Sequence, residues 1–243
     1  MTNILTTPQT AGELARLFAA AQAQEAARDR VEAAEQNGGT PPGPAPTPGP
    51  VPGPVPVPVP EEQLTALERA NARQDAYMPV SAEGGQLLYA LTRAARPQTV
   101  VEFGTSFGIS TIFLAAAVID NGVGRVFSTE LSPAKIRAAQ ENLHRAGVDG
   151  PVTVLAGDAR ETLADVPGPI GLVLLDGWKD LYLPVLHLLE PRLAPGALVI
   201  ADDSSFASVA DYLAYVRDPA HGYVTVSFPV EDGMEMSSWT GGN

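Results

Sequence analysis

Residues 100–111 constrain this chain more than any other stretch, because they read V-V-E-F-G-T-S-F-G-I-S-T. Three apolar residues interrupted by Glu102 predict a short buried strand. Gly104 and Gly108 then allow a sharp turn, and Ser110 opens an alanine-rich helix. In an open α/β sheet, such a junction presents unpaired backbone N–H groups at the carboxyl end of the strand, where nucleotide-type cofactors bind.

The acidic residue before this loop indicates the charge of the cofactor. Dinucleotide-binding folds use a G-x-G-x-x-G loop packed against a pyrophosphate, whereas this loop has G-x-x-x-G spacing and follows Glu102. A carboxylate there would repel a pyrophosphate. It would suit a cationic cofactor such as S-adenosylmethionine, which carries an ammonium and a sulfonium. An ordinary strand-to-helix turn with two glycines is the simpler alternative for this segment taken by itself.

Composition limits the remaining possibilities. A chain of 243 residues with 45% hydrophobic residues fits one large α/β domain with an appendage. No apolar run approaches the ~20 residues of a membrane span and no signal-peptide pattern begins the chain, so we expect a soluble, cytoplasmic protein. The net charge of −13 argues against nucleic acid or an anionic membrane as partner. Without cysteine, any metal must be held by oxygen or histidine.

The first sixty residues predict two segments outside the main domain. Residues 1–39 form a helical segment, in which Thr10 and Glu13 predict a capping box and the helix runs from about residue 11 to about residue 34. Its second half is too polar for a core. Residues 40–60 form a linker or loop, since positions 41–60 contain eleven prolines. A docking peptide for a proline-reading module is the alternative for this segment.

Residues 61–243 predict a doubly wound, Rossmann-like α/β domain with a seven-stranded sheet. Five parallel βα units precede a C-terminal antiparallel hairpin, which turns at Asp232-Gly233, and helices precede the first strand. One helix is predicted from Glu61 to a turn at residues 78–80, and Ser81 caps the next. The predicted strands are 100–103, 125–129, 152–155, 171–175, 197–201, 223–228 and about 235–240.

Acidic residues end several of these strands. Glu130 ends the second strand, where it can accept hydrogen bonds from ribose hydroxyls. Asp176 ends the fourth strand and Asp202-Asp203 ends the fifth, so their carboxylates emerge at one edge of the sheet, where adjacent strands are ~5 Å apart. Such a set of hard oxygen ligands suits Mg²⁺. A role as helix caps is the alternative for each aspartate taken singly.

Four motifs carry a resemblance to a known family. They are M-P-V-S-A-E-G-G-Q-L-L at 78–88, the glycine loop at 100–111, L-D-G-W-K-D-L-Y-L-P at 175–184 and A-D-D at 201–203. Over roughly two thirds of its length, the chain resembles the class I S-adenosylmethionine-dependent O-methyltransferases of the catechol and caffeoyl-CoA O-methyltransferase type. The proline-rich segment lies outside this resemblance.

The resemblance implies a role for each matching residue. The methionine end of S-adenosylmethionine would be lined by Val80, Glu102, Gly104, Ser106 and Ser110, the ribose would be held by Glu130, and the adenine would be bordered by Asp158 and Ala159. Trp178 would pack on the side of the cofactor, which Asp176 would also contact. Mg²⁺ or another divalent cation would be bound by Asp176, Asp202 and Asp203, and Lys179 would act with Asp176 in catalysis.

The implied reaction is methyl transfer to a hydroxyl of a small phenolic or hydroxylated substrate. Mg²⁺ bound to vicinal hydroxyls makes them more acidic and fixes their direction, and Lys179 can accept the proton. A solvated lysine at a helix start is the alternative for that residue. A homodimer is the oligomer that we consider, and we expect neither nucleic acid nor a membrane as partner.

Two departures from catechol O-methyltransferase leave the acceptor open. Asp203 stands where that enzyme has an asparagine, which adds a negative charge to the predicted metal site. The V-S-F-P-V segment at 226–230 offers no clear equivalent of its acidic substrate-contacting residue. A metal-independent methyltransferase of the same fold remains an alternative. So does an interaction protein that binds the cofactor and acts through the proline-rich arm.

Overall fold

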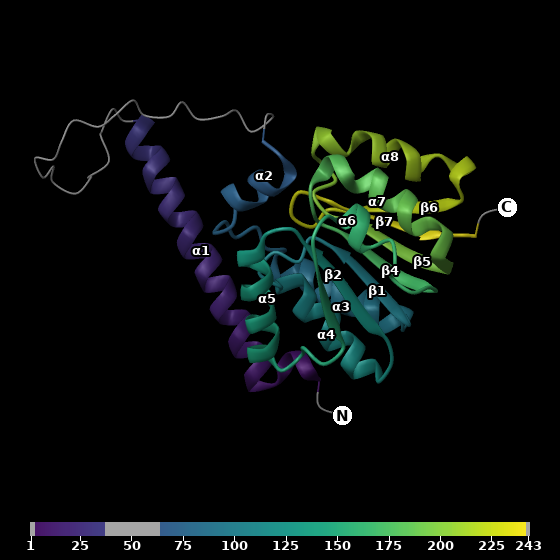
Figure 1. The fold of residues 1–243 in the computed structure, drawn as a ribbon, viewed down its shortest axis with the longest axis horizontal. Coiled ribbons are helices and arrows are strands. Elements are labelled where there is room, and N and C mark those ends of the chain that lie inside the picture. Colours follow the sequence, from purple (N-terminus) through teal and green to yellow (C-terminus); the bar gives the residue numbers. More distant parts are fainter. Residues whose placement is uncertain (1–2, 37–63, 242–243) are drawn as a thin grey trace, which may run out of the picture.

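The computed structural model describes residues 3–36 and 64–241, and a seven-stranded sheet forms their centre (Figure 1). The strand order is β3-β2-β1-β4-β5-β7-β6, with β1 to β5 parallel and β7 antiparallel to both of its neighbours. This confirms the predicted fold class. The strands are β1 (Thr99–Phe103), β2 (Arg125–Glu130), β3 (Val152–Ala156), β4 (Ile170–Leu175), β5 (Leu193–Ala201), β6 (Tyr223–Phe228) and β7 (Met234–Trp239).

Helices cover both faces of the sheet. Alternate strand residues point to opposite faces, so that Val100 of β1 joins one buried cluster and Val101 joins the other. The first cluster includes residues of α1, α3, α4 and α5, and the second includes residues of α6, α7 and α8. The helices are α1 (Pro8–Gln36), α2 (Ala66–Ala72), α3 (Ala82–Ala95), α4 (Ile109–Asn121), α5 (Pro133–Ala146), α6 (Ala159–Thr162), α7 (Tyr182–Leu189) and α8 (Ala210–Arg217).

The predicted capping box at Thr10 is wrong. Helix α1 begins at Pro8, two residues before Thr10, and Thr7 Oγ1 accepts the hydrogen bond from the Thr10 N–H. Thr10 instead donates from Oγ1 to the backbone oxygen of Ala146 in α5, and Glu13 pairs with Arg16. A tertiary contact between α1 and α5 therefore uses the hydroxyl that the local pattern assigned to the helix end.

The second predicted helix is shorter than expected. Helix α2 begins at Ala66, after a capping box in which Thr65 and Glu68 bond each other's backbone N–H groups. The predicted start at Glu61 lies outside the described residues. In contrast, the predicted cap at Ser81 is confirmed, since its Oγ accepts the Gly84 N–H. Helices α6 and α7 were not individually predicted.

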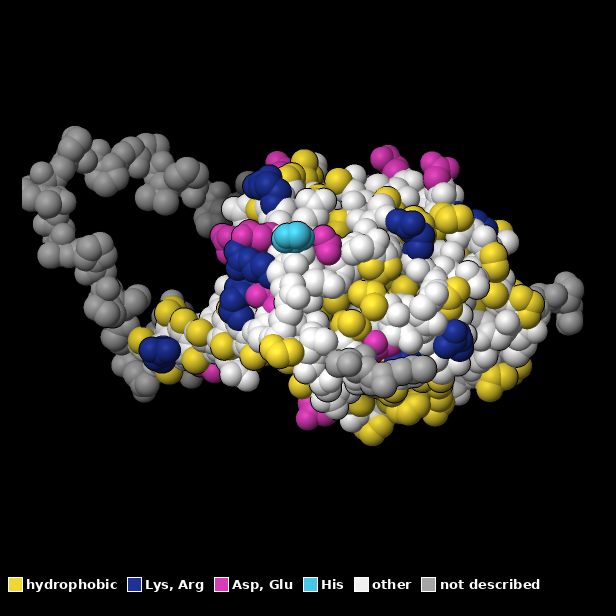
Figure 2. Space-filling model, turned by 90° about the horizontal axis from the view of Figure 1, so that it is seen from below, with side chains coloured by type: hydrophobic (Ala, Val, Ile, Leu, Met, Phe, Trp, Pro, Cys, Tyr) yellow, Lys and Arg dark blue, Asp and Glu magenta, His cyan; other side chains and the backbone are white. Residues whose placement is uncertain are grey.

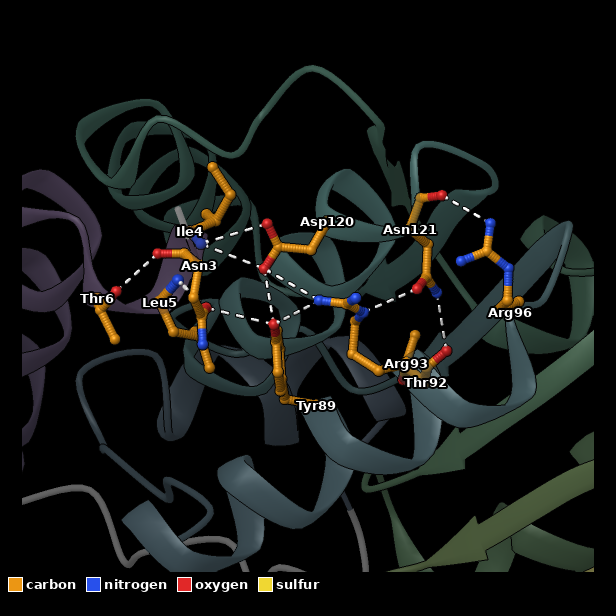
Figure 3. Close-up of polar contacts among 10 residues, drawn as sticks. All are labelled: Asn3, Ile4, Leu5, Thr6, Tyr89, Thr92, Arg93, Arg96, Asp120 and Asn121. Atoms are coloured by element: carbon orange, nitrogen blue, oxygen red, sulfur yellow. Dashed lines mark hydrogen bonds and ion pairs between the residues drawn. The ribbon is translucent and has the colours of Figure 1, made fainter. Parts of the chain in front are cut away.

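A hydrogen-bonded network joins the N-terminal segment to α3 and α4 (Figure 3). Asp120 accepts from the Ile4 N–H and, at 2.6 Å, from Tyr89 Oη. Arg93 donates to Tyr89 Oη and to Asn121 Oδ1, and its guanidinium lies 3.5 Å from the Asp120 carboxylate. The segment just before α1 is thereby attached to helices α3 and α4, which pack on the sheet.

The far half of α1 is exposed, as its polar composition predicted, and Figure 2 shows this end of the helix projecting from the body. Gln24 connects it to the segment before α3, because its side chain donates to the Asp75 oxygen and accepts the Tyr77 N–H. The predicted linker at 40–60 lies outside the described residues, so the division at residues 39 and 61 stays a prediction. Within the described residues, every helix is too short or too polar to cross a membrane.

Candidate functional site

A cleft of about 660 Å³ lies at the carboxyl ends of the parallel strands. Ligand sites of open α/β sheets occupy this position, and the volume is typical of a cofactor or small-molecule site. Val80 and Ser110 line a small hollow that shares Gly104, Ser106 and Asp176 with the cleft. The predicted site residues that line the main cleft are Gly104, Ser106, Glu130, Asp158, Ala159, Asp176, Trp178, Lys179, Asp202 and Asp203.

The turn after β1 needs glycine for close packing. Gly104 has a φ of 109°, and a Cβ there would come within 2.6 Å of the Asp176 backbone oxygen. Gly108, with a φ of 84°, caps α4. Between them Ser106 has a φ of 47°, an unfavourable conformation for a residue with a side chain. Its N–H donates to Glu130 Oε2 at 2.9 Å, which ties the loop to the end of β2.

Glu102 is fully buried behind this loop and is absent from the residues that line the cleft. Its Oε2 accepts hydrogen bonds from Thr111 Oγ1 and Ser128 Oγ, both at 2.5 Å. Its Oε1 has no hydrogen-bond partner within the described part of the chain. Burial raises the pKa of the Glu102 carboxyl, and the hydrogen bonds offset this only in part.

The residues predicted for the ribose and adenine lie along the next two strand ends. Glu130 accepts the N–H groups of Leu131 and Ser132 on Oε1, in addition to that of Ser106 on Oε2. Since a carboxylate has about four acceptor positions, Glu130 keeps capacity for a further donor. Asp158 caps α6 with its side chain and forms an ion pair with Arg160 at 2.7 Å.

Trp178 lies against helix α2. The guanidinium groups of Arg69 and Arg73 lie 4.9 Å and 5.4 Å from the centre of its ring. Cation–π contacts of this kind hold α2 at the Trp178 side of the cleft. Residues of the 66–78 stretch thus contribute a wall to the site, which the sequence analysis did not predict.

Three aspartates meet at the ends of β4 and β5. One carboxylate oxygen of each of Asp176, Asp202 and Asp203 lies within 4.8 Å of the other two. Asp203 has a φ of 57°, a left-handed conformation that aspartate and asparagine adopt more readily than most residues. Asp202 Oδ1 is buried without a hydrogen-bond partner in the described residues. Hard oxygen donors with one orphaned oxygen fit the ligand preferences of Mg²⁺.

The electrostatics of this cluster favour a bound cation or proton. Burial raises the pKa of Asp176 well above its ordinary value, and the Asp202 charge adds to the effect. Burial also raises the pKa of Asp202 to about 7, together with the charges of Asp203 and Glu231. The Lys179 ammonium opposes this repulsion, because Nζ lies 2.7 Å from Asp203 Oδ2 and 3.5 Å from Asp176 Oδ1.

Tyr182 positions Lys179, a contact that the sequence analysis missed. Lys179 Nζ donates to Tyr182 Oη at 2.7 Å, and Tyr182 Oη donates to the Asp202 backbone oxygen at 3.2 Å. Burial raises the pKa of the Tyr182 phenol well above its ordinary value, so the hydroxyl stays protonated. Tyr182 stands three residues after Lys179 in the D-x-W-K-D-x-Y-L-P string, and this spacing could have predicted the contact between the two side chains.

Acidic residues near the C-terminus do reach the cleft, although not in segment 226–230. Val226 lies on β6 with 48% of its surface exposed, whereas Glu231 and Asp232 of the following turn line the cleft. Glu231 Oε1 accepts the Ser81 N–H at 2.5 Å, across 150 positions of sequence. Sequence spacing carries no signal for such a contact, because the turn meets α3 only in the folded chain.

Comparisons with known proteins agree with this geometry. Residues 101–204 match a family described as a methyltransferase domain. Mouse catechol O-methyltransferase is 28% identical over 191 residues, which cover 73% of this chain and 71% of that protein. The pig catechol O-methyltransferase is 30% identical over 147 residues, which cover 58% of this chain and 78% of that protein.

Solved structures show the same fold. A cofactor-bound protein from Mycobacterium tuberculosis superposes with a TM-score of 0.63 and 27% identity, covering 73% of this chain and 90% of that one. The O-methyltransferase TomG from Streptomyces achromogenes, solved in complex with SAM, superposes with a TM-score of 0.59 and 24% identity, covering 72% and 88%.

Proposed function

This chain belongs to the class I S-adenosylmethionine-dependent O-methyltransferases of the catechol and caffeoyl-CoA type, and from that premise we propose its substrate and its metal. The acceptor is a small molecule with a catechol-like or vicinal-diol group. A divalent cation, Mg²⁺ in the first instance, is bound by Asp176, Asp202 and Asp203.

The observation that carries this proposal is the aspartate cluster facing the cleft. Three carboxylate oxygens lie within 4.8 Å of one another, and Asp202 Oδ1 has no partner within the described residues. A buried like-charge cluster is costly unless a cation neutralises it. Two similar relatives from mouse and pig are named catechol O-methyltransferases, which supports an acceptor with adjacent hydroxyls.

The cofactor lies along the other strand ends in this proposal. Gly104, Ser106 and Ser110 receive the methionine end, with Val80 beside them and the unpaired Glu102 oxygen behind. Glu130 accepts from the ribose hydroxyls. The adenine lies by Asp158, Ala159 and Trp178 in this proposal, and Asp176 lines both the small hollow and the main cleft.

Lys179 is the proton acceptor in the proposed reaction. A bound divalent cation supplies positive charge that lowers the pKa of an acceptor hydroxyl. In its deprotonated form Lys179 takes the hydroxyl proton at Nζ while Tyr182 Oη holds its position. This requires that the cation replace the Lys179 ammonium as the counter-charge of Asp176 and Asp203. The acceptor oxygen then forms its bond to the methyl carbon as the carbon–sulfur bond breaks. S-adenosylhomocysteine and the methylated acceptor are the products.

The experiment is a metal titration with labelled S-adenosylmethionine and paired acceptors. After EDTA treatment and dialysis, the protein is assayed on a catechol and on the matching monophenol with increasing Mg²⁺. We expect turnover of the catechol only, with at least about 100-fold loss on chelation. Asp202→Asn should lose as much, and Asp165→Asn, an exposed control, should not. Undiminished turnover after chelation would overturn the metal assignment.

Asp203→Asn is the milder variant in the same titration. It removes one negative charge from the cluster and keeps an oxygen donor and a side chain that tolerates the left-handed backbone. We expect weaker Mg²⁺ binding with activity retained at saturating metal and a pH profile shifted to lower pH. Identical behaviour to the wild type at every metal concentration would remove Asp203 from the ligand set.

A metal-independent methyltransferase is the second candidate. The observation in its favour is that Lys179 already lies between Asp176 and Asp203 and offsets part of their charge. In that case Lys179→Met abolishes turnover while EDTA leaves the wild type unaffected. The metal titration therefore separates the two candidates directly.

A further inference from the structure

Lys135 is a buried cation on the wall of the cleft. It lies in the first turn of α5, only 4% of its surface is exposed, and it lines the cleft near Ser106 and Glu130. A cation in the first turn of a helix is opposed by the helix dipole, and burial of an ammonium adds a further cost. Neither the helix nor the core gains stability from a lysine here.

The ammonium has few partners within the protein. Nζ donates to Ser106 Oγ at 3.2 Å and lies 5.4 Å from the centre of the Phe107 ring. Within the described residues, these are the hydrogen bond and the cation–π contact of Nζ, and neither is an ion pair. Because an ammonium has three N–H donors, a neutral hydroxyl and a ring leave it short of a counter-charge.

The surrounding charges do not remove this deficit. Glu130 and Asp176 attract the ammonium and Arg73 repels it, but burial dominates and lowers the pKa of Lys135. The Glu130 carboxylate accepts three backbone N–H groups, and within the described residues it forms no ion pair with Lys135. A stack of Phe107 on Tyr77, with ring centres 4.0 Å apart, flanks the lysine and helps to fix it.

We propose that Lys135 Nζ binds the carboxylate of the methionine moiety of S-adenosylmethionine and thereby sets the position of the cofactor. Of the charged groups on this cofactor, the ammonium and the sulfonium are cationic, and the carboxylate is the one anion. Ser106 hydrogen-bonds Lys135 and belongs to the loop assigned to the methionine end. The inference rests on the proposed placement of the cofactor.

The test compares two ligands and three variants by calorimetry. The ligands are S-adenosylhomocysteine and its decarboxylated analogue, which keeps the amine and the adenosine. Lys135→Met removes the charge, Lys135→Arg keeps it, and Arg137→Met removes an exposed charge two residues along the same helix. We expect Lys135→Met to raise the Kd of S-adenosylhomocysteine about 10- to 100-fold and to leave that of the analogue unchanged. Lys135→Arg should recover part of the loss.

The outcomes separate binding from folding. The unfolding temperature of Lys135→Met should equal or exceed that of the wild type, because a buried cation is removed. Equal loss for both ligands, or no loss for S-adenosylhomocysteine, would overturn the inference and leave the proposed function intact. Failure of the wild type to bind S-adenosylhomocysteine would overturn the cofactor placement itself and the inference with it.

Discussion

Two buried glutamates, on strands β1 and β7 of the sheet, differ in whether a cationic side chain pairs with them. Glu102 on β1 and Glu235 on β7 have 0% and 1% of their surface exposed, and each accepts hydrogen bonds from two side-chain hydroxyls. Only Glu235 has a cation, since Arg217 donates to both of its oxygens at 2.7 Å and 3.0 Å.

The cation decides the direction in which the pKa of the carboxyl group is shifted. Burial raises the pKa of both groups, but the bonds from Arg217 and the hydroxyls bring that of Glu235 below its ordinary value, whereas that of Glu102 stays raised. Glu235 is satisfied and joins β7 to α8. Glu102 retains an unpaired oxygen behind the glycine loop, which is consistent with the proposed role of this loop in cofactor binding.

The largest expected effect comes from removing the cation. Arg217→Met leaves Glu235 buried without a counter-charge and should lower the free energy of unfolding by about 3 kcal/mol, near the lower end for a broken buried pair because the Arg217 side chain is half exposed. Urea unfolding at neutral pH measures this. The double variant with Glu235→Gln should recover more than half of the loss, and a loss unchanged in the double variant would contradict the comparison.

The next effect is on the cofactor. Glu102→Gln keeps the size of the side chain and removes its charge, so the affinity for S-adenosylhomocysteine should fall by about 1 to 3 kcal/mol while the free energy of unfolding changes by less than about 1 kcal/mol. Calorimetry and urea unfolding report the two quantities. Glu235→Gln is the matched control, and it should lower the free energy of unfolding while leaving the affinity for S-adenosylhomocysteine unchanged. Equal effects of both variants on affinity would end the distinction between the two sites.

The pH dependence should have opposite signs at the two sites. The ordinary pKa of both groups is 4.5, and Glu102 titrates above it when folded, so its stabilising contribution is present below pH 4.5 and is lost as the pH rises through the folded value. Glu235 titrates below 4.5, so its contribution is present above pH 4.5 and is lost as the pH falls through the folded value. Unfolding of the wild type and both glutamine variants across pH measures each difference, and parallel curves would contradict the assignment.

The smallest effect concerns the network in Figure 3, where the Asp120 carboxylate is paired with Arg93, as Glu235 is with Arg217. Tyr89→Phe removes the hydroxyl that donates to Asp120 and accepts from Arg93. We expect the free energy of unfolding to fall by only about 1 kcal/mol, because Arg93 still lies 3.5 Å from Asp120. The affinity for S-adenosylhomocysteine should not change, because neither Tyr89 nor Asp120 lines the cleft. A change in affinity would show that the network reaches the cleft.

Local patterns were predicted well where few neighbours decide them. The cap at Ser81 depends on the Gly84 N–H, three positions along the chain. The capping box at Thr10 failed for the opposite reason, since its hydroxyl bonds Ala146 from 136 positions away. The strand ends and the resemblance both indicated the three aspartates, and the resemblance indicated Lys179. Neither assigned a role to Tyr182, Glu231 or Lys135.

By itself the sequence determined the succession of strands along the chain, the glycine loop and the acidic residues that end the strands, because periodicity and strand polarity act along the chain. The tertiary structure decided which charges meet. Glu235 received Arg217, Glu102 received only hydroxyls, and Lys135 received Ser106. The free energy of a buried charge depends on partners distant in sequence, so the same residue type is structural at one position and open to a ligand at another.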